Sequence, residues 1–224
     1  MTEHSSPHKT RTITDAQAQY PDTCVILFAK YPARDMAKTR LQPALGVEGA
    51  ARMARQLLLH SVEQAVATDF VVELCVSPAA IEPCWQTLNL PDSLQWSTQA
   101  DGDLGTRLIT ASQDALKRYQ KIVLIGSDCP SLTAERIQTA VQQLDAHDAV
   151  MTPATDGGYV LFGFKQFDGS LFSDIVWSTA SVATVTRQRV ADLGWTLALL
   201  APLHDIDEPA DLEHLPSDWL KFAQ

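Results

Sequence analysis

The sequence lacks the glycine patterns of several large enzyme classes. The loop after its first apolar run is neither a Gly-x-Gly-x-x-Gly dinucleotide fingerprint nor a P-loop. No Gly-x-Ser-x-Gly nucleophile elbow occurs anywhere in the chain. These absences argue against dehydrogenases, P-loop kinases and serine hydrolases of that type.

Cysteine pairs, histidine clusters and long apolar runs are also missing. The four cysteines show no Cys-x-x-Cys spacing, and the six histidines show no metal-ligand spacing. Cys24 and Cys75 lie in apolar runs, where a buried thiol is the ordinary interpretation. No segment is apolar and long enough to cross a bilayer, and residues 1–19 do not form a signal peptide. We therefore expect a reduced, cytoplasmic protein with no membrane partner.

What the chain does have is enough apolar sequence for one sizeable core and a marked excess of acid. Of its 224 residues, 46% are hydrophobic and 20% are charged, and the net charge is -10. This predicts one domain over residues 21–224, preceded by a disordered or loosely ordered lead-in over residues 1–20. An acidic surface repels phosphate backbones, so we expect no nucleic-acid partner. A nucleotide bound to such a protein would usually need a cation between its phosphates and the protein carboxylates.

Short apolar runs alternate with helical patterns along the chain. The predicted strands are Cys24–Ala29, Phe70–Ser77, Ile122–Gly126, Ala149–Thr152, Tyr159–Phe164 and Trp195–Leu200. The predicted helices are Val47–Ala67, Leu104–Tyr119, Thr133–Leu144 and Val182–Leu193, with a last short helix opened by Pro209. Asp103 and Thr133 stand where side chains cap helix starts. This alternation predicts an α/β fold with a mostly parallel central sheet and helices on both faces. In such folds ligands bind beyond the carboxyl ends of the strands.

Two acidic segments follow predicted strands. Asp128 comes directly after the apolar run that ends at Gly126, where its carboxylate is a suitable oxygen ligand for Mg²⁺ or Mn²⁺. Asp205 and Asp207 follow the last predicted strand, and Asp207 with Asp128 matches the one or two carboxylates typical of a magnesium diphosphate site. The alternative is that each aspartate only caps a following helix.

Cations gather in the loop after the first strand. Lys30, Lys38 and Arg40 lie in this loop of an otherwise acidic chain, which favours a site for a diphosphate over a merely solvated loop. Further along, Gly102 and Gly105 would let the backbone approach a flat ligand. Arg107 could reach a phosphate or a base, although a flexible loop with a cap explains the same stretch.

A third group of candidates lies in the second half of the chain. Asp156, Gly157 and Gly158 precede a strand, where they form either a hairpin turn or a contact to a sugar or acceptor. In the second case Asp156 would orient the acceptor or act as its general base. Trp177 could stack on a sugar, although tryptophan is more often a core residue.

Together, in this order, these segments resemble one known family. The matching stretches are Phe28-Ala-Lys-Tyr-Pro, Lys38-Thr-Arg-Leu41, Gly102-Asp-Leu-Gly105, Gly126-Ser-Asp-Cys-Pro130, Asp156-Gly-Gly-Tyr159, Trp177-Ser-Thr179 and Asp205-Ile-Asp207. They are similar to those of bacterial nucleotide-diphospho-sugar transferases of the glycosyltransferase-A fold, some associated with arsenosugar biosynthesis or radical-SAM gene neighbourhoods. The resemblance covers about residues 24–215.

The resemblance implies a nucleotide-binding first half, an acceptor-binding second half and a metal at Asp128. By analogy with wider relatives, it implies that Asp207 completes the metal site. The first loop of the family usually has glycine where this chain has Asp35. Aspartate tolerates a left-handed backbone better than most residues, so we expect the turn to persist. The added negative charge is expected to alter phosphate binding.

The leading hypothesis is a metal-dependent glycosyltransferase that moves a sugar from a nucleoside-diphosphate sugar to a small-molecule acceptor. One alternative is a nucleotidyltransferase that joins a nucleoside triphosphate to a metabolite, since that class shares the fold. Its members commonly carry a glycine-rich first loop, and residues 30–38 contain no glycine. The other alternative is a non-catalytic nucleotide-binding protein on the same scaffold. The sugar, base, acceptor and oligomeric state do not follow from the sequence.

Overall fold

The computed structural model describes residues 22–217 and Trp219, and the predicted lead-in of residues 1–20 lies outside them. The strands are β1 (Thr23–Lys30), β2 (Val71–Ser77), β3 (Gln95–Thr98), β4 (Lys121–Ile125), β5 (Ala149–Pro153), β6 (Tyr159–Phe164) and β7 (Leu197–Leu199). The α-helices are α1 (Gln42–Val66), α2 (Leu104–Leu116), α3 (Ala134–Ala146) and α4 (Val182–Asp192). Short 3-10 helices are η2 (Thr39–Leu41), η3 (Pro83–Leu88), η4 (Gly169–Leu171) and η5 (Pro209–His214).

The strands form one sheet in the order β3-β2-β1-β4-β6-β5-β7. β1 pairs in parallel with β2 and β4, and β5 pairs in parallel with β7. Only β6 runs against its neighbours among the described strands, because it follows β5 through a tight hairpin. The predicted mostly parallel sheet is confirmed. We call the end at which β1, β2 and β4 finish the carboxyl end of the sheet, and the opposite end the amino end.

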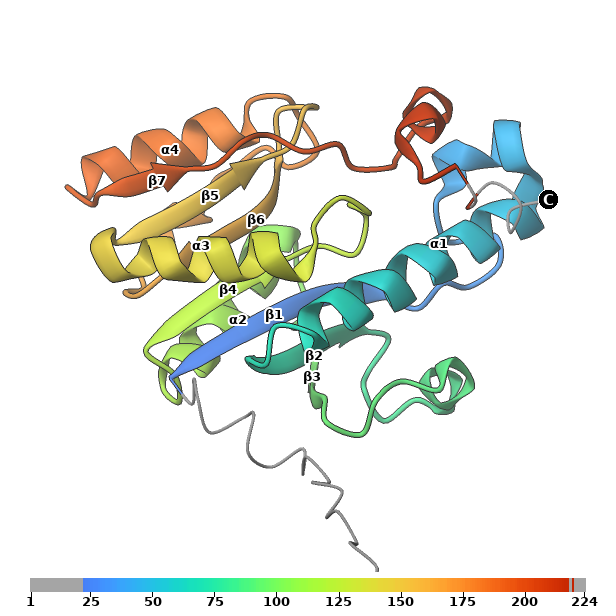
Figure 1. Cartoon of the computed structure of the whole chain (residues 1–224), viewed down its shortest axis with the longest axis horizontal. Coiled ribbons are helices and arrows are strands. Elements are labelled where there is room, and N and C mark those ends of the chain that lie inside the picture. The colour runs from blue at the N-terminus through green and yellow to red at the C-terminus, as the bar shows by residue number, and fades with distance from the viewer. Residues whose placement is uncertain (1–21, 218, 220–224) are drawn as a thin grey trace, which may run out of the picture.

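Helices cover both faces of this sheet, as predicted (Figure 1). Leu58 and Val62 of α1 and Ile137 of α3 pack against one face, in a cluster that includes Val25 and Leu27 of β1. Leu108 of α2 and Val190 of α4 belong to the cluster on the other face. β1 is therefore covered on both sides, and this explains why its first five residues are all apolar or small and fully buried.

A third apolar cluster joins the start of α1 to the C-terminal segment. Leu41, Met53 and Leu57 pack there with Ile206 and Trp219. In Figure 1 the red η5 segment accordingly lies beside the blue and cyan start of α1. This contact brings the loop after β1 next to the segment that contains Asp207. Among the described residues, no helix has the length and apolar content needed to cross a membrane.

Strand β3 and the start of α3 differ from the expectations, whereas the start of regular helix in α1 and the cap of α2 agree with them. Strand β3 was not among the predicted strands, because three of its four residues are exposed and it has no apolar run. Gly46 has φ 68° and interrupts α1, so regular helix begins near the predicted Val47. Asp103 caps α2 through the Thr106 N–H at 2.8 Å, as predicted. Thr133 occupies the N-cap of α3 without a side-chain capping bond, and the Gln64 side chain accepts from the N–H of Ala134, the first residue of the helix.

Candidate active site

Asp128 and Asp207 come together at the carboxyl end of the sheet. Asp128 follows β4, and its backbone carbonyl accepts a hydrogen bond from the Ile206 N–H at 2.9 Å. That bond fixes the segment of Asp207 beside the end of β4. The two carboxylates that the sequence separates by 79 positions therefore face one position.

The side chain of Lys38 lies between the two carboxylates. Its Nζ is 2.8 Å from Asp128 Oδ1 and 2.5 Å from Asp207 Oδ1. The side chain is only 9% exposed, whereas each aspartate is nearly half exposed. Burial disfavours the charged ammonium, but the attraction of Asp128 and then Asp207 outweighs it, so the pKa of Lys38 is raised. The ammonium is thus held charged between the pair.

Neither aspartate acts as a helix cap with its side chain. The N-cap of η5 is Glu208, and the side chain of Asp211 accepts from the N–H groups of Asp207 and Glu208. The N-cap of α3 is Thr133, beyond Asp128. This geometry leaves the two carboxylates for the contact with Lys38, and the capping alternative loses its support.

The oxygen donors of this pair fit a divalent metal. Mg²⁺ at a diphosphate takes one or two protein carboxylates and fills its remaining positions with water and phosphate oxygens. The pair supplies two carboxylates that already share a single cation, the Lys38 ammonium. Within residues 22–217 and Trp219, no cluster of three or more His, Cys, Asp or Glu side chains is arranged to hold a metal. A metal here would therefore need phosphate or water oxygens to complete its coordination.

The other predicted donor residues lie around this pair but make different contacts. Arg40 lines the pocket described below and lies 3.5 Å from Glu208 Oε1. Lys30 is exposed at the end of β1. Asp35 adopts a left-handed backbone with φ 64°, as expected for a residue that replaces glycine in a turn. Their roles in phosphate binding stay predictions.

Arg107 and the two glycines before it make internal contacts. The guanidinium of Arg107 donates to Gly102 O and to Gln99 Oε1, both at 3.1 Å. Gln99 in turn donates to the carbonyls of Ala29 and Cys75, at 3.1 and 3.0 Å, and so links the ends of β1 and β2. Arg107 thus holds Gln99 in place. The sequence did not indicate a role for Gln99, because no local pattern marks this residue.

The glycines of this segment have structural reasons of their own. A Cβ on Gly105 would lie 2.5 Å from the Phe172 carbonyl oxygen, so only glycine allows α2 to pack there. Gly102 has φ 115°, which side chains rarely adopt. These observations explain why both positions are glycine even if no ligand binds near them. That their backbone approaches a nucleotide stays a prediction.

A pocket of about 320 Å³ opens beside the acidic pair. It is bounded by the carboxyl ends of β1 and β4, the start of β6, the start of α2 and the segment before α4. Its lining includes Phe28, Arg40, Leu104, Leu108, Gly126, Asp156, Gly158, Tyr159, Val160, Trp177, Thr179, Val182 and Asp207. The predicted acceptor residues Asp156, Gly158 and Trp177 therefore share one cavity with Asp207. The apolar wall was not predicted from the sequence, because Phe28, Leu104 and Leu108 look like ordinary core residues there.

The Asp156 turn is both a hairpin and a wall of this pocket. Asp156 Oδ1 accepts from the Gly158 N–H at 2.8 Å, which stabilises the β5–β6 connection. Gly157 has φ 96° and packs against the backbone of Ala180. Trp177 is partly buried against the α2 side of the core, and its Nε1 has no hydrogen-bond partner. The turn and the ring are therefore structural and also accessible to a ligand.

Acidic groups accumulate around the site. Burial first, and then the nearby negative charges of Asp156 and Asp207, raise the pKa of Asp205 to about 6 against the opposing effect of Lys38. Among the described residues, Lys38 is the cation that contacts Asp128 and Asp207. The local field thus favours an additional positive charge.

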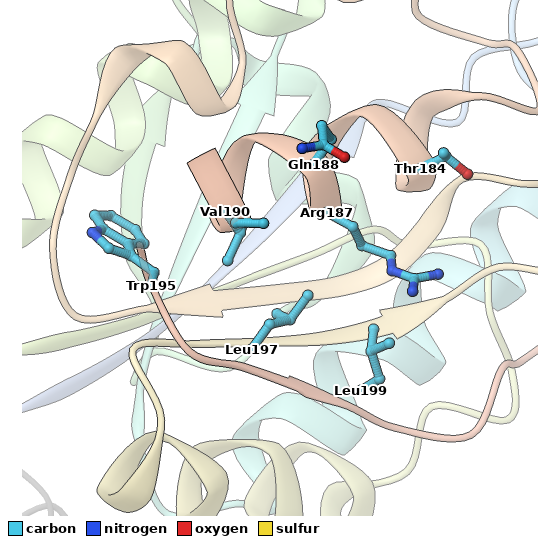
Figure 2. A pocket seen from close by; sticks show the side chains of 8 residues that line it. Thr184, Arg187, Gln188, Val190, Trp195, Leu197 and Leu199 are labelled. Carbon is cyan, nitrogen blue, oxygen red and sulfur yellow. The ribbon is translucent and has the colours of Figure 1, made fainter. Parts of the chain in front are cut away.

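A second hollow, of about 430 Å³, lies away from these residues between α4 and β7 (Figure 2). Val190, Trp195, Leu197 and Leu199 give it an apolar lining, and Arg187 is its one charged side chain. It contains none of the candidate residues and lies along the β7 side of the sheet rather than at the carboxyl end. We therefore place the candidate active site at the first pocket.

Comparison with known proteins gives a family and a fold. The family model described as "Uncharacterized protein conserved in bacteria" (DUF2064) matches residues 58–179. No curated protein matches the sequence. A structure described as "putative nucleotide-diphospho-sugar transferase", from Desulfovibrio desulfuricans, is 30% identical with a TM-score of 0.80, over 85% of this chain and 84% of that one.

More distant structures share the fold alone. A CMP:2-keto-3-deoxy-manno-octonic acid synthetase complexed with CTP is 13% identical, with a TM-score of 0.55 over 86% of this chain and 96% of its own. Rv0371c of Mycobacterium tuberculosis in complex with manganese is 11% identical, with a TM-score of 0.53 over 91% of this chain and 100% of its own. The fold predicted from the sequence, that of nucleotide-diphospho-sugar transferases, is confirmed.

Proposed function

The chain belongs to the DUF2064 family and has the nucleotide-diphospho-sugar transferase fold, and from this we propose that it is a glycosyltransferase. It would transfer a sugar from a nucleoside-diphosphate sugar to a small-molecule acceptor. The observation that carries the proposal is the convergence of Asp128, Asp207 and Lys38 beside a pocket at the carboxyl end of the sheet. Ligands of open α/β sheets bind at this end.

The acidic pair is the proposed metal site. Asp128 and Asp207 would hold Mg²⁺ or Mn²⁺, which supplies charge stabilisation for a departing diphosphate. The manganese complex of the distant relative Rv0371c is consistent with this choice of ion. Lys38 and Arg40 would add positive charge from the loop after β1, and we keep Lys30 and Arg107 as proposed further contacts to the phosphates.

The pocket is the proposed site for the sugar and its acceptor. Asp156 lies on its wall, where its carboxylate would orient an acceptor hydroxyl or remove its proton. Trp177 offers an aromatic surface on which a sugar ring could stack. Gly157 and Gly158 keep the turn narrow and leave space beside Asp156.

The relative in complex with CTP supports a second candidate function, nucleotidyl transfer. Such an enzyme would use the same carboxylates to bind a nucleoside triphosphate and release pyrophosphate. Against it stands the loop of residues 30–38, which contains no glycine and makes its left-handed turns at Asp35 and Lys38.

One screen separates these functions. Thermal unfolding of the full chain is followed with Mn²⁺ and UDP-, GDP-, CDP- or dTDP-sugars, since a ligand that binds the folded state raises its stability. We expect one donor to stabilise the protein and to be hydrolysed slowly to its nucleoside diphosphate. Pyrophosphate release from a nucleoside triphosphate and a phosphorylated metabolite would instead identify a nucleotidyltransferase. Binding without any turnover under all metals would identify a non-catalytic nucleotide-binding protein.

A further inference from the structure

We propose that Lys38 and the divalent metal are alternative occupants of one cation position, so that Lys38 acts as a built-in competitor of the metal. The inference rests on the proposed function, because it concerns the same carboxylate pair. It adds that the metal binds well only when the anionic donor draws Lys38 away. Lys38 is then a positioning residue that couples binding of the metal to binding of the donor.

The contacts of Lys38 carry this inference. Its ammonium contacts one oxygen of each carboxylate, Oδ1 of Asp128 at 2.8 Å and Oδ1 of Asp207 at 2.5 Å. A Mg²⁺ ion bound through these same two oxygens would need them at about 2.0–2.1 Å. An ammonium and a dication that share the same oxygens repel each other strongly in a partly buried site. One must therefore leave when the other binds.

The loop is built so that only the side chain of Lys38 has to move. Its backbone is left-handed, with φ 46° and ψ 46°, and forms the N-cap of η2. Leu41, three residues on, is fully buried in the cluster that joins α1 to the C-terminal segment. The backbone is thus anchored, while the four-carbon stem of a lysine can adopt several rotamers.

Another cation that contacts two carboxylates provides a contrast. Arg34 lies 3.0 Å from Glu48 and 3.8 Å from Asp35, but its side chain is 67% exposed. Water replaces such contacts at little cost. The Lys38 side chain is 9% exposed, so its removal leaves Asp128 and Asp207 facing each other without the cation that now lies between them.

A donor diphosphate provides the driving force for the exchange. Its negative charge offers the Lys38 ammonium a new partner, and the freed carboxylates then accept the metal. Metal and donor should therefore raise each other's affinity, and this coupling must be reciprocal. The metal alone should bind weakly, because without donor only a small fraction of the molecules has Lys38 turned away from Asp128 and Asp207.

The test measures Mn²⁺ binding to the full chain without any nucleotide. Four proteins are titrated, by the electron paramagnetic resonance signal of free Mn²⁺: the wild type, Lys38→Met, Lys38→Arg and Lys117→Met. Lys38→Arg keeps a cation between the carboxylates. Lys117→Met removes the same charge from an exposed ion pair with Asp114. We expect Lys38→Met to bind Mn²⁺ about tenfold or more tighter than the wild type, and both controls to resemble the wild type.

Thermal unfolding provides a second measurement on the same proteins. Without metal, Lys38→Met should unfold at a lower temperature than Lys117→Met, and Mn²⁺ should raise its Tm more than that of the wild type. If Lys38→Met does not fold, Lys38→Gln replaces it, because glutamine is neutral and still donates hydrogen bonds. Equal or weaker Mn²⁺ binding by the folded neutral variant would overturn the inference.

This test is independent of the proposed function. Tighter Mn²⁺ binding by Lys38→Met supports the inference even if no sugar nucleotide is ever turned over. Transfer activity together with unchanged Mn²⁺ binding in Lys38→Met refutes the inference and leaves the proposed function standing.

Discussion

Carboxylates and cations are paired differently at the two ends of the sheet. At the amino end two carboxylates each have a cation of their own: Lys121 lies 2.6 Å from Asp145, and Arg118 lies 2.5 Å from Glu73. At the carboxyl end one buried lysine serves both Asp128 and Asp207, and further carboxylates lie nearby. The amino end is thus locally satisfied and stabilises the fold, whereas the carboxyl end keeps an excess of negative charge. That excess is suited to a cationic ligand or cofactor.

The largest expected effect separates the two ends by activity. Asp207→Asn removes one carboxylate of the proposed metal site and should lower the rate of sugar transfer or donor hydrolysis by about a hundredfold or more. Asp145→Asn removes the same charge at the amino end and should leave the rate near that of the wild type. Steady-state kinetics with the donor from the screen measures both. Equal rates for Asp207→Asn and the wild type would contradict the assignment of function to the carboxyl end.

The second effect concerns the turn beside the pocket. A methyl group on Gly157 would overlap the backbone of Ala180, and the φ of 96° disfavours any side chain. We expect Gly157→Ala to lower the free energy of unfolding by about 1–3 kcal/mol. Gly169→Ala is the matched control, because a Cβ there meets nothing within 4 Å. Urea denaturation compares them, and similar midpoints would show that the turn is not sterically tight.

The third effect tests the satisfied pairs of the amino end. Arg118→Ala leaves the Glu73 side chain, which is only 5% exposed, without its cation, and should destabilise the fold by about 1–3 kcal/mol. Lys117→Ala breaks an exposed pair with Asp114 and should cost less than about 0.5 kcal/mol. Both variants should bind the donor normally. A loss of donor affinity in Arg118→Ala would contradict the assignment of ligand binding to the carboxyl end alone.

The smallest effect is a dependence of stability on pH at the amino end. Asp148 accepts from the Thr196 hydroxyl at 2.6 Å and from its N–H at 2.8 Å, and these bonds lower the pKa of Asp148 below 3.8. Its ionised form therefore contributes stability above pH 3.8, and the contribution is lost as the pH falls towards the lowered pKa. Asp148→Asn should be slightly less stable than the wild type at pH 7, and the difference should shrink below pH 3.8. A stability difference between Asp148→Asn and the wild type that stays constant down to pH 2 would show that ionised Asp148 does not stabilise the fold.

The sequence was sufficient for the architecture because most elements carry their own signal. The apolar run of residues 24–29 needed no partner to be recognised as a buried strand, and Asp103 capped α2 as its position predicted. Strand β3 gave no such signal, because three of its four side chains are exposed. Its pairing with β2 depends on long-range contacts that no local pattern reports.

The candidate site could be predicted only in part, for a related reason. Asp128 and Asp207 were recognisable by their places after strands, but a helix cap explained Asp128 equally well and was the better explanation of Asp207 taken alone. For Asp207, the capping box of Glu208 and Asp211 removes the cap explanation, and only the folded segment shows it. Lys38 looked like one of several cations in a loop. Its contact with Asp207 spans 169 positions and depends on its left-handed backbone, so no local pattern indicates it.

The most direct test of the central claim is the affinity for the donor with and without Mn²⁺. Isothermal titration calorimetry would compare the wild type, Asp128→Asn and the control Asp145→Asn, using the sugar nucleotide identified by the screen. We expect Mn²⁺ to tighten donor binding about tenfold or more in the wild type and the control, and not in Asp128→Asn. Full metal-dependent affinity in Asp128→Asn would contradict the assignment of Asp128 and Asp207 as the metal site.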